Sequence, residues 1–85
     1  MKKYDFTERC KEIACDYEMN HSEYRRKLYK RDVVITEYKY SSTELYAECH
    51  IDKQRLYRIR YDARYDQFEV EIYTLKDSVL YIRNH

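Results

Sequence analysis

A two-residue alternation of apolar and polar side chains runs from residue 33 to residue 83 and constrains the fold more than any other feature of the chain. This period is typical of β-strands that bury one face and expose the other. The alternation predicts strands at 33–40, 44–51, 55–62, 67–74 and 79–83. Because the segments between them are short, the strands are expected to form an antiparallel meander of four or five strands.

Loop lengths then predict which residues face each other. A loop at 52–54 and a second loop at 63–66 keep apolar residues on one side of three successive strands. The inner face is predicted to hold Leu45, Ala47, Cys49, Tyr57, Ile59, Tyr61, Phe68, Val70 and Ile72. The outer face is predicted to hold Tyr46, Glu48, Arg58, Arg60, Glu69, Glu71 and Tyr73. A slip of one residue would exchange the two faces, so the agreement across hairpins favours this register.

The outer strands are less well determined. A loop at 76–78 places Tyr81 opposite Tyr73 on the outer face and Ile82 opposite Ile72 on the inner face. In the first strand Val33 and Ile35 suit the inner face, but charged residues follow them at the same spacing. Two interpretations are consistent with this pattern: a β-bulge near residue 36, or an edge strand that is solvent-exposed on both faces. We assign Tyr38 to the outer face.

The N-terminal third of the chain has the period of a helix. Its apolar stripe consists of Phe6, Cys10, Ile13, Ala14 and Tyr17. We expect a helical part at 5–31, formed either by one bent helix or by two short ones, and a sheet at 33–83. The helical part should pack on the inner face of the sheet, giving a single α+β domain that spans residues 1–85.

The chain contains no glycine and no proline. This excludes the glycine-dependent phosphate loops, dinucleotide turns, nucleophile elbows and EF-hand loops. Three cysteines and three histidines are present without the spacing of a zinc site. We therefore expect no catalytic residues, no metal and no cofactor, and we interpret the protein as a non-enzyme.

The outer face is the more unusual feature, because twelve tyrosines accompany only two phenylalanines and no tryptophan. Tyrosine and arginine are the residue types enriched at the energetic centres of protein interfaces. The predicted partner-binding residues are Tyr38, Tyr46, Arg58, Arg60, Tyr73 and Tyr81. The competing interpretation is a solvent-exposed sheet whose cross-strand pairs only specify register.

A basic segment supplies the alternative function. Residues 25–31 carry five positive charges beside aromatic residues, a pattern found in nucleic-acid-binding proteins. The predicted contacts are Arg25, Arg26, Lys27, Lys30 and Arg31. The net charge of +1 provides no wider attraction for a polyanion, so protein binding is the favoured interpretation. A third interpretation is a homodimer formed through the exposed edge of strand 33–40.

Cysteine usage and hydropathy bear on location. The three cysteines are odd in number, and no apolar stretch of a signal peptide or a membrane span is present. We expect free thiols, no membrane partner and a reducing, cytoplasmic setting.

A short, charge-dense, tyrosine-rich chain that opens MKKYDFTERC and lacks glycine and proline resembles the small phage-encoded inhibitors of host defence, of which anti-CRISPR proteins are the best-known class. The resemblance covers size and composition. It implies a protein that acts without catalysis, in the host cytoplasm, by occupying a surface of a host protein or nucleoprotein. Many such inhibitors are strongly acidic mimics of nucleic acid, so the charge of +1 leaves steric blocking or conformational locking as the implied mode.

Overall fold

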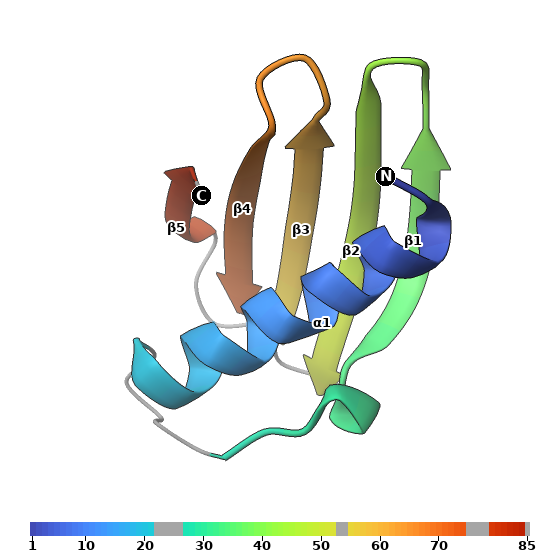
Figure 1. The fold of residues 1–85 in the computed structure, drawn as a ribbon. Coiled ribbons are helices and arrows are strands. Elements are labelled where there is room, and N and C mark those ends of the chain that lie inside the picture. The colour runs from blue at the N-terminus through green and yellow to red at the C-terminus, as the bar shows by residue number, and fades with distance from the viewer. Residues whose placement is uncertain (22–26, 53–54, 75–78, 85) are drawn as a thin grey trace.

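The computed structural model describes residues 1–21, 27–52, 55–74 and 79–84, with the backbone alone described for Asp52 and for 79–84. The elements in chain order are α1 (Lys3–Asn20), η1 (Lys30–Asp32), β1 (Val34–Tyr40), β2 (Glu44–Asp52), β3 (Arg55–Asp62), β4 (Gln67–Thr74) and β5 (Val79–Asn84). The strands pair antiparallel in the order β1-β2-β3-β4-β5, and α1 crosses one face of the sheet (Figure 1). The predicted α+β fold, a helix on an antiparallel meander, is confirmed.

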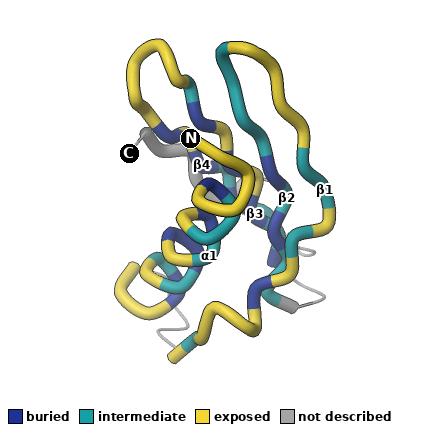
Figure 2. The backbone as a smooth tube through the Cα atoms, turned by 45° about the vertical axis from the view of Figure 1, so that its right-hand side comes forward, coloured by how far each residue is buried: buried dark blue, intermediate teal, exposed yellow. Residues whose placement is uncertain are grey.

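The predicted register of the central strands is also confirmed. Ala47 pairs with Ile59, which in turn pairs with Val70, and all three lie on the face under α1. Every second residue of β3 from Arg55 to Tyr61 is buried. Figure 2 shows buried segments along α1 and β2, whereas the two hairpin ends at the top are exposed. The loop at 63–66 has the predicted length, and Asp66 adopts a positive φ of 51° there in the absence of glycine.

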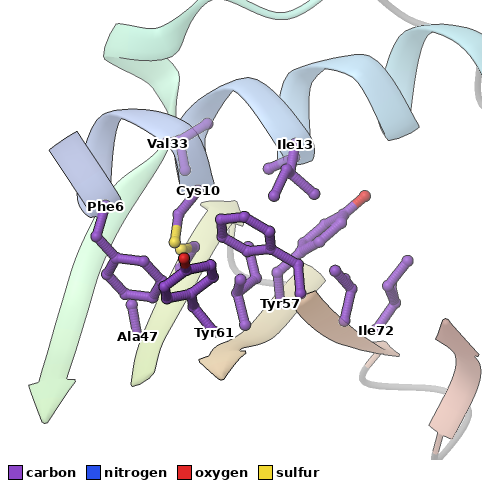
Figure 3. Packing of buried hydrophobic residues seen from close by; sticks show 13 residues of the cluster. Phe6, Cys10, Ile13, Val33, Ala47, Tyr57, Tyr61 and Ile72 are labelled. Carbon is purple, nitrogen blue, oxygen red and sulfur yellow. The ribbon is translucent and has the colours of Figure 1, made fainter. Parts of the chain in front are cut away.

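The core lies between α1 and the inner face of the sheet. Phe6, Cys10, Ile13 and Ala14 come from the helix, and they meet buried residues of β2, β3 and β4 (Figure 3). Phe6 stacks on Phe68 with ring centroids 6.3 Å apart. Burial of this apolar stripe, more than helix propensity, is what holds α1 in place.

A bulge in β1 changes the assignment of one predicted site residue. The register with β2 shifts between Ile35 and Glu37, so Thr36 is the extra residue. Tyr38 consequently pairs with Ala47 and packs against Phe6 at 6.1 Å on the inner face. The prediction of a bulge near residue 36 is confirmed, and the assignment of Tyr38 to the outer face is wrong because the bulge reverses the alternation after it.

The pairing of β5 also differs from the prediction. Tyr81 pairs with Ile72, and Ile82 pairs with Glu71, one residue away from the expected register. The register shifts between Ile72 and Tyr73, and an irregularity of this kind moves every following pair by one position. The prediction that Tyr81 faces Tyr73 is therefore wrong, and the backbone offers no support for Tyr81 in the outer-face site.

The helical part is shorter than the predicted range of 5–31. The helix α1 ends at Asn20, residues 27–29 are not helical, and among the described residues up to Asp32 the other helical turn is the short η1. The backbone N–H of Tyr29 donates to the Asp32 carboxylate at 2.9 Å, which stabilises this turn. Residues 22–26, where a second helix was expected to begin, lie outside the described residues.

A buried ion pair joins the end of α1 to the sheet. The Glu18 carboxylate accepts hydrogen bonds from Arg55 at 2.7 Å and from the Tyr57 hydroxyl at 2.6 Å. Glu18 is fully buried and Arg55 is 4% exposed. Burial and the Glu18 carboxylate raise the pKa of Tyr57, so its hydroxyl remains a donor. This contact holds the C-terminal half of α1 over β3.

Breaking this ion pair from one side should be costly. We expect Glu18→Leu to lower the free energy of unfolding by about 3–5 kcal/mol, because the buried Arg55 loses this carboxylate. The double variant Glu18→Leu/Arg55→Met removes both charges and should recover part of the loss, since the buried Tyr57 hydroxyl still lacks its acceptor. Urea denaturation measures both. A single variant as stable as the wild type would contradict the assigned role of the pair, and Glu18→Gln serves if Glu18→Leu does not fold.

The thiols give a second test of the fold. Contact with the Cys49 thiol, together with burial, raises the pKa of Cys10, and both residues are fully buried. Cys15 is only partly buried. A thiol reagent such as Ellman's reagent should therefore modify at most Cys15 in the native protein and all three cysteines after unfolding. Rapid native modification of all three would contradict the helix packing.

Candidate functional site on the outer face of the sheet

The outer face is the side of the sheet that points away from α1, and no described element packs on it (Figure 1). Alternation along β2, β3 and β4 carries polar side chains to this side. Its central row runs across four strands through Glu37, Glu48, Arg58 and Glu71. The next row holds Lys39, Tyr46, Arg60 and Glu69. The first row therefore sets three carboxylates against one guanidinium.

Short contacts order the centre of this face. The Tyr46 hydroxyl donates to Glu48 at 2.6 Å, and the Tyr73 hydroxyl donates to Glu71 at the same distance. Arg58 lies between the two carboxylates, with its Nε 3.3 Å from Glu48. Its guanidinium also lies 5.0 Å from the centre of the Tyr73 ring. We call these five residues, Tyr46, Glu48, Arg58, Glu71 and Tyr73, the central cluster.

Arg60 extends the central cluster along β3. It reaches Glu69 at 3.5 Å and Glu44 at 3.8 Å, and its guanidinium lies 5.9 Å from the centre of the Tyr46 ring. Its side chain is nevertheless 45% exposed, so solvent screens these ion pairs and each contributes little to folding stability. The exposed guanidinium retains donors for another molecule.

The electrostatics keep Tyr46, Glu48 and Tyr73 each in one protonation state near neutral pH. The hydrogen bond from Tyr46, together with Arg58, lowers the pKa of Glu48 against the opposing effect of burial. Burial and the Glu48 carboxylate raise the pKa of Tyr46. The hydrogen bond to Glu71 likewise raises the pKa of Tyr73. Each shift moves the group away from neutral pH, so these tyrosines remain donors and Glu48 remains a carboxylate.

The face is hollowed over β1, β2 and β3. A shallow, open hollow of about 490 Å³ is lined by residues that include Glu37, Tyr40, Tyr46, Glu48, Arg58 and Arg60. Its walls are charged and aromatic, with little aliphatic surface. Such a surface provides hydrogen bonds and ring faces to a bound group more readily than an apolar pocket.

The structure brings together four of the six predicted partner-binding residues: Tyr46, Arg58, Arg60 and Tyr73. It also adds residues that sequence reasoning missed. The predicted phase of strand 33–40 gave Glu37 and Lys39 the inner positions, whereas the bulge turns both to the outer face, where they form an ion pair at 3.1 Å. The charged side chains themselves were the available signal, because the inner face rarely accepts them.

The alternative site is only partly described. Arg25 and Arg26 lie outside the described residues. Lys30 is engaged by Glu8 at 3.4 Å. Lys27 and Arg31 lie against the Tyr29 ring, with the Arg31 guanidinium 4.4 Å from its centre. Much of the described basic charge is thus already held within the molecule.

The described residues also bear on metal binding and on membrane crossing. Within residues 1–21, 27–52, 55–74 and 79–84, His, Cys, Asp and Glu side chains form no group of three or more arranged to hold a metal ion. No helix among the same residues has the length and hydropathy needed to cross a membrane. Comparison of the chain with protein-family models, curated proteins and solved structures finds no match.

Tyrosine ionisation tests the central cluster. A raised pKa means that the folded state favours the neutral phenol. The hydrogen bonds of these tyrosines therefore contribute fully to folding stability below about pH 10, and this contribution is lost as the pH rises further. In an absorbance titration the folded protein should show fewer than twelve tyrosinates where the urea-unfolded chain shows all twelve. Tyr46→Phe should remove absorbance amplitude from the late phase, which is the part of the titration that occurs above the ordinary tyrosine pKa of about 10. Loss of early amplitude instead would contradict the Tyr46–Glu48 hydrogen bond.

Proposed function

We propose that this protein is a small, non-enzymatic protein-binding domain whose contact surface is the outer face of the sheet. The observation that carries the proposal is the central cluster, a set of tyrosine, arginine and glutamate side chains held by mutual bonds on a face that no described element covers. Side chains ordered before binding lose less conformational entropy when a partner docks.

The residue types favour a protein partner. Tyr46 and Tyr73 provide large, rigid surfaces with a hydroxyl at the rim, and Arg58 and Arg60 provide planar donors. The central row carries Glu37, Glu48 and Glu71 against Arg58 alone. Three carboxylates repel phosphates, so a nucleic-acid backbone is a poor occupant, whereas a protein surface of mixed charge with basic side chains is complementary.

The protonation states support a binding role over a catalytic one. A general acid or base works best with a pKa near the operating pH. The pKa values of Glu48, Tyr46 and Tyr73 are instead shifted away from neutrality. Their hydrogen bonds fix geometry and charge, as a recognition surface requires.

A narrower role follows from the resemblance to small phage-encoded inhibitors. In this role the protein acts in the host cytoplasm and blocks a host defence protein or nucleoprotein by stoichiometric binding. The net charge of +1 argues for occlusion of a protein surface instead of mimicry of a nucleic acid. Identification of the captured partner as a defence nuclease or one of its subunits would support this role.

Affinity capture from a bacterial lysate tests the assigned face. We expect the wild-type protein to retain a partner in stoichiometric amount, and we expect Arg60→Glu and Tyr73→Ala each to weaken capture at least about tenfold, because buried aromatic and arginine contacts dominate interface energies. Arg60 and Tyr73 lie on the open face, so circular dichroism should show an unchanged fold. Unchanged capture by both variants would reject the face.

Two matched controls lie away from the outer face. Tyr4→Ala removes an exposed tyrosine of α1, and Arg31→Glu reverses an exposed charge of η1. Both should capture the partner as the wild type does. Loss of capture with Arg31→Glu alone, together with nucleic-acid binding that falls steeply with salt, would assign the function to the basic segment instead.

A further inference from the structure

We propose that the free edge of β1 is a homodimer interface, in which β1 pairs antiparallel with β1 of a second copy about a two-fold axis at Tyr38. β1 ends the strand order of the sheet, and no described strand pairs with its other edge (Figure 1). An unpaired edge offers a row of backbone donors and acceptors to another strand. The inference is independent of the binding role of the outer face.

The backbone geometry decides which residues serve the open edge. The N–H of Ser41 donates to the carbonyl of Glu44 at 2.8 Å, which makes these two a hydrogen-bonded pair. In an antiparallel ladder bonded and non-bonded pairs alternate. The pairs Lys39–Tyr46 and Glu37–Glu48 are therefore bonded within the sheet. The N–H and C=O groups of Tyr38 and Tyr40 point away from β2 to the open edge.

A two-fold antiparallel pairing can centre either on a residue whose backbone groups face outward or on one whose groups face β2. Centring on Glu37 or on Lys39 sets that charge directly opposite itself, which is destabilising. Centring on Tyr38 sets Glu37 of each copy directly opposite Lys39 of the other, on the outer face. Centring on Tyr40 instead sets Lys39 opposite Ser41 and leaves the charges unmatched. Only the Tyr38 register is charge-complementary to itself, and opposite charges directly across a strand pair stabilise the pairing.

The exposed side chains along the edge agree with this register. Tyr40 is exposed and, in this register, lies near Thr36 of the second copy. Lys39, 70% exposed, is the kind of edge residue that normally opposes strand addition. Glu37 of the same copy already pairs with Lys39 at 3.1 Å. In this register Glu37 of the second copy lies opposite Lys39 as well, so two carboxylates and two ammonium groups meet across the edge.

The oligomeric state and a charge swap test this dimer. In analytical ultracentrifugation the wild-type mass should rise with concentration from 10.7 kDa toward twice that value. Lys39→Glu and Glu37→Lys should each raise the dissociation constant about tenfold or more, since both symmetry-related pairs become repulsive. The double variant Glu37→Lys/Lys39→Glu restores both pairs with reversed polarity and should dimerise as the wild type does.

Two further variants complete the experiment. Tyr40→Pro removes an outward N–H without removing a bond to β2, and it should also abolish the dimer. Lys27→Glu makes the same change in net charge as Lys39→Glu at an exposed position away from the edge, and it should leave the dimer intact. A wild-type protein that stays monomeric at every concentration would overturn the proposal, as would a dimer insensitive to both single charge reversals.

Discussion

The register of β2, β3 and β4 is the constraint on which the rest of the molecule depends. It places Ala47, Ile59 and Val70 beneath α1, and the same pairing places Glu48, Arg58 and Glu71 on the opposite side. A shift of one residue between any two of these strands would send charged groups into the core and apolar groups into water. The same strand register therefore determines both the stability of the core and the composition of the outer face.

The helix is attached to this sheet by two different kinds of contact. Phe6 packs apolar surface against Tyr38 and Phe68 near the start of α1. Near its end, Glu18 binds Arg55 in a dry environment, where the desolvation of both charges offsets much of their attraction. Such a pair adds little net stability but tolerates few alternative geometries. It thereby fixes how α1 crosses the sheet and confines the helix to the inner face.

The two-residue period and the loop lengths in the sequence were sufficient to predict the strands and the pairing of β2, β3 and β4. Sequence reasoning found the pairs of the central strands because the buried residues from Ala47 to Ile72, with the exception of Arg55, are apolar and recur at every second position of their strands. It missed Glu18 because a lone carboxylate on a helix takes its buried role only from Arg55, a residue distant in the sequence. It indicated the bulge from the charged residues that follow Ile35, but it placed Tyr38 wrongly because the faces after a bulge depend on which residue is the extra one. It placed Tyr81 wrongly because the irregularity between β4 and β5 changes the pairing that loop length predicts.

The bulge at Thr36 links the core to both proposed surfaces. By adding one residue it turns Tyr38 inward to meet Phe6, and it turns Glu37 and Lys39 outward. The Thr36 hydroxyl donates to the carbonyl of Glu48 at 3.4 Å, which partly replaces the ladder bonding that the bulge disrupts. Glu37 and Lys39, which extend the two rows of the outer face onto β1, are also the charges that make the β1 edge self-complementary. Core packing at Tyr38 and recognition at this edge consequently cannot be altered independently.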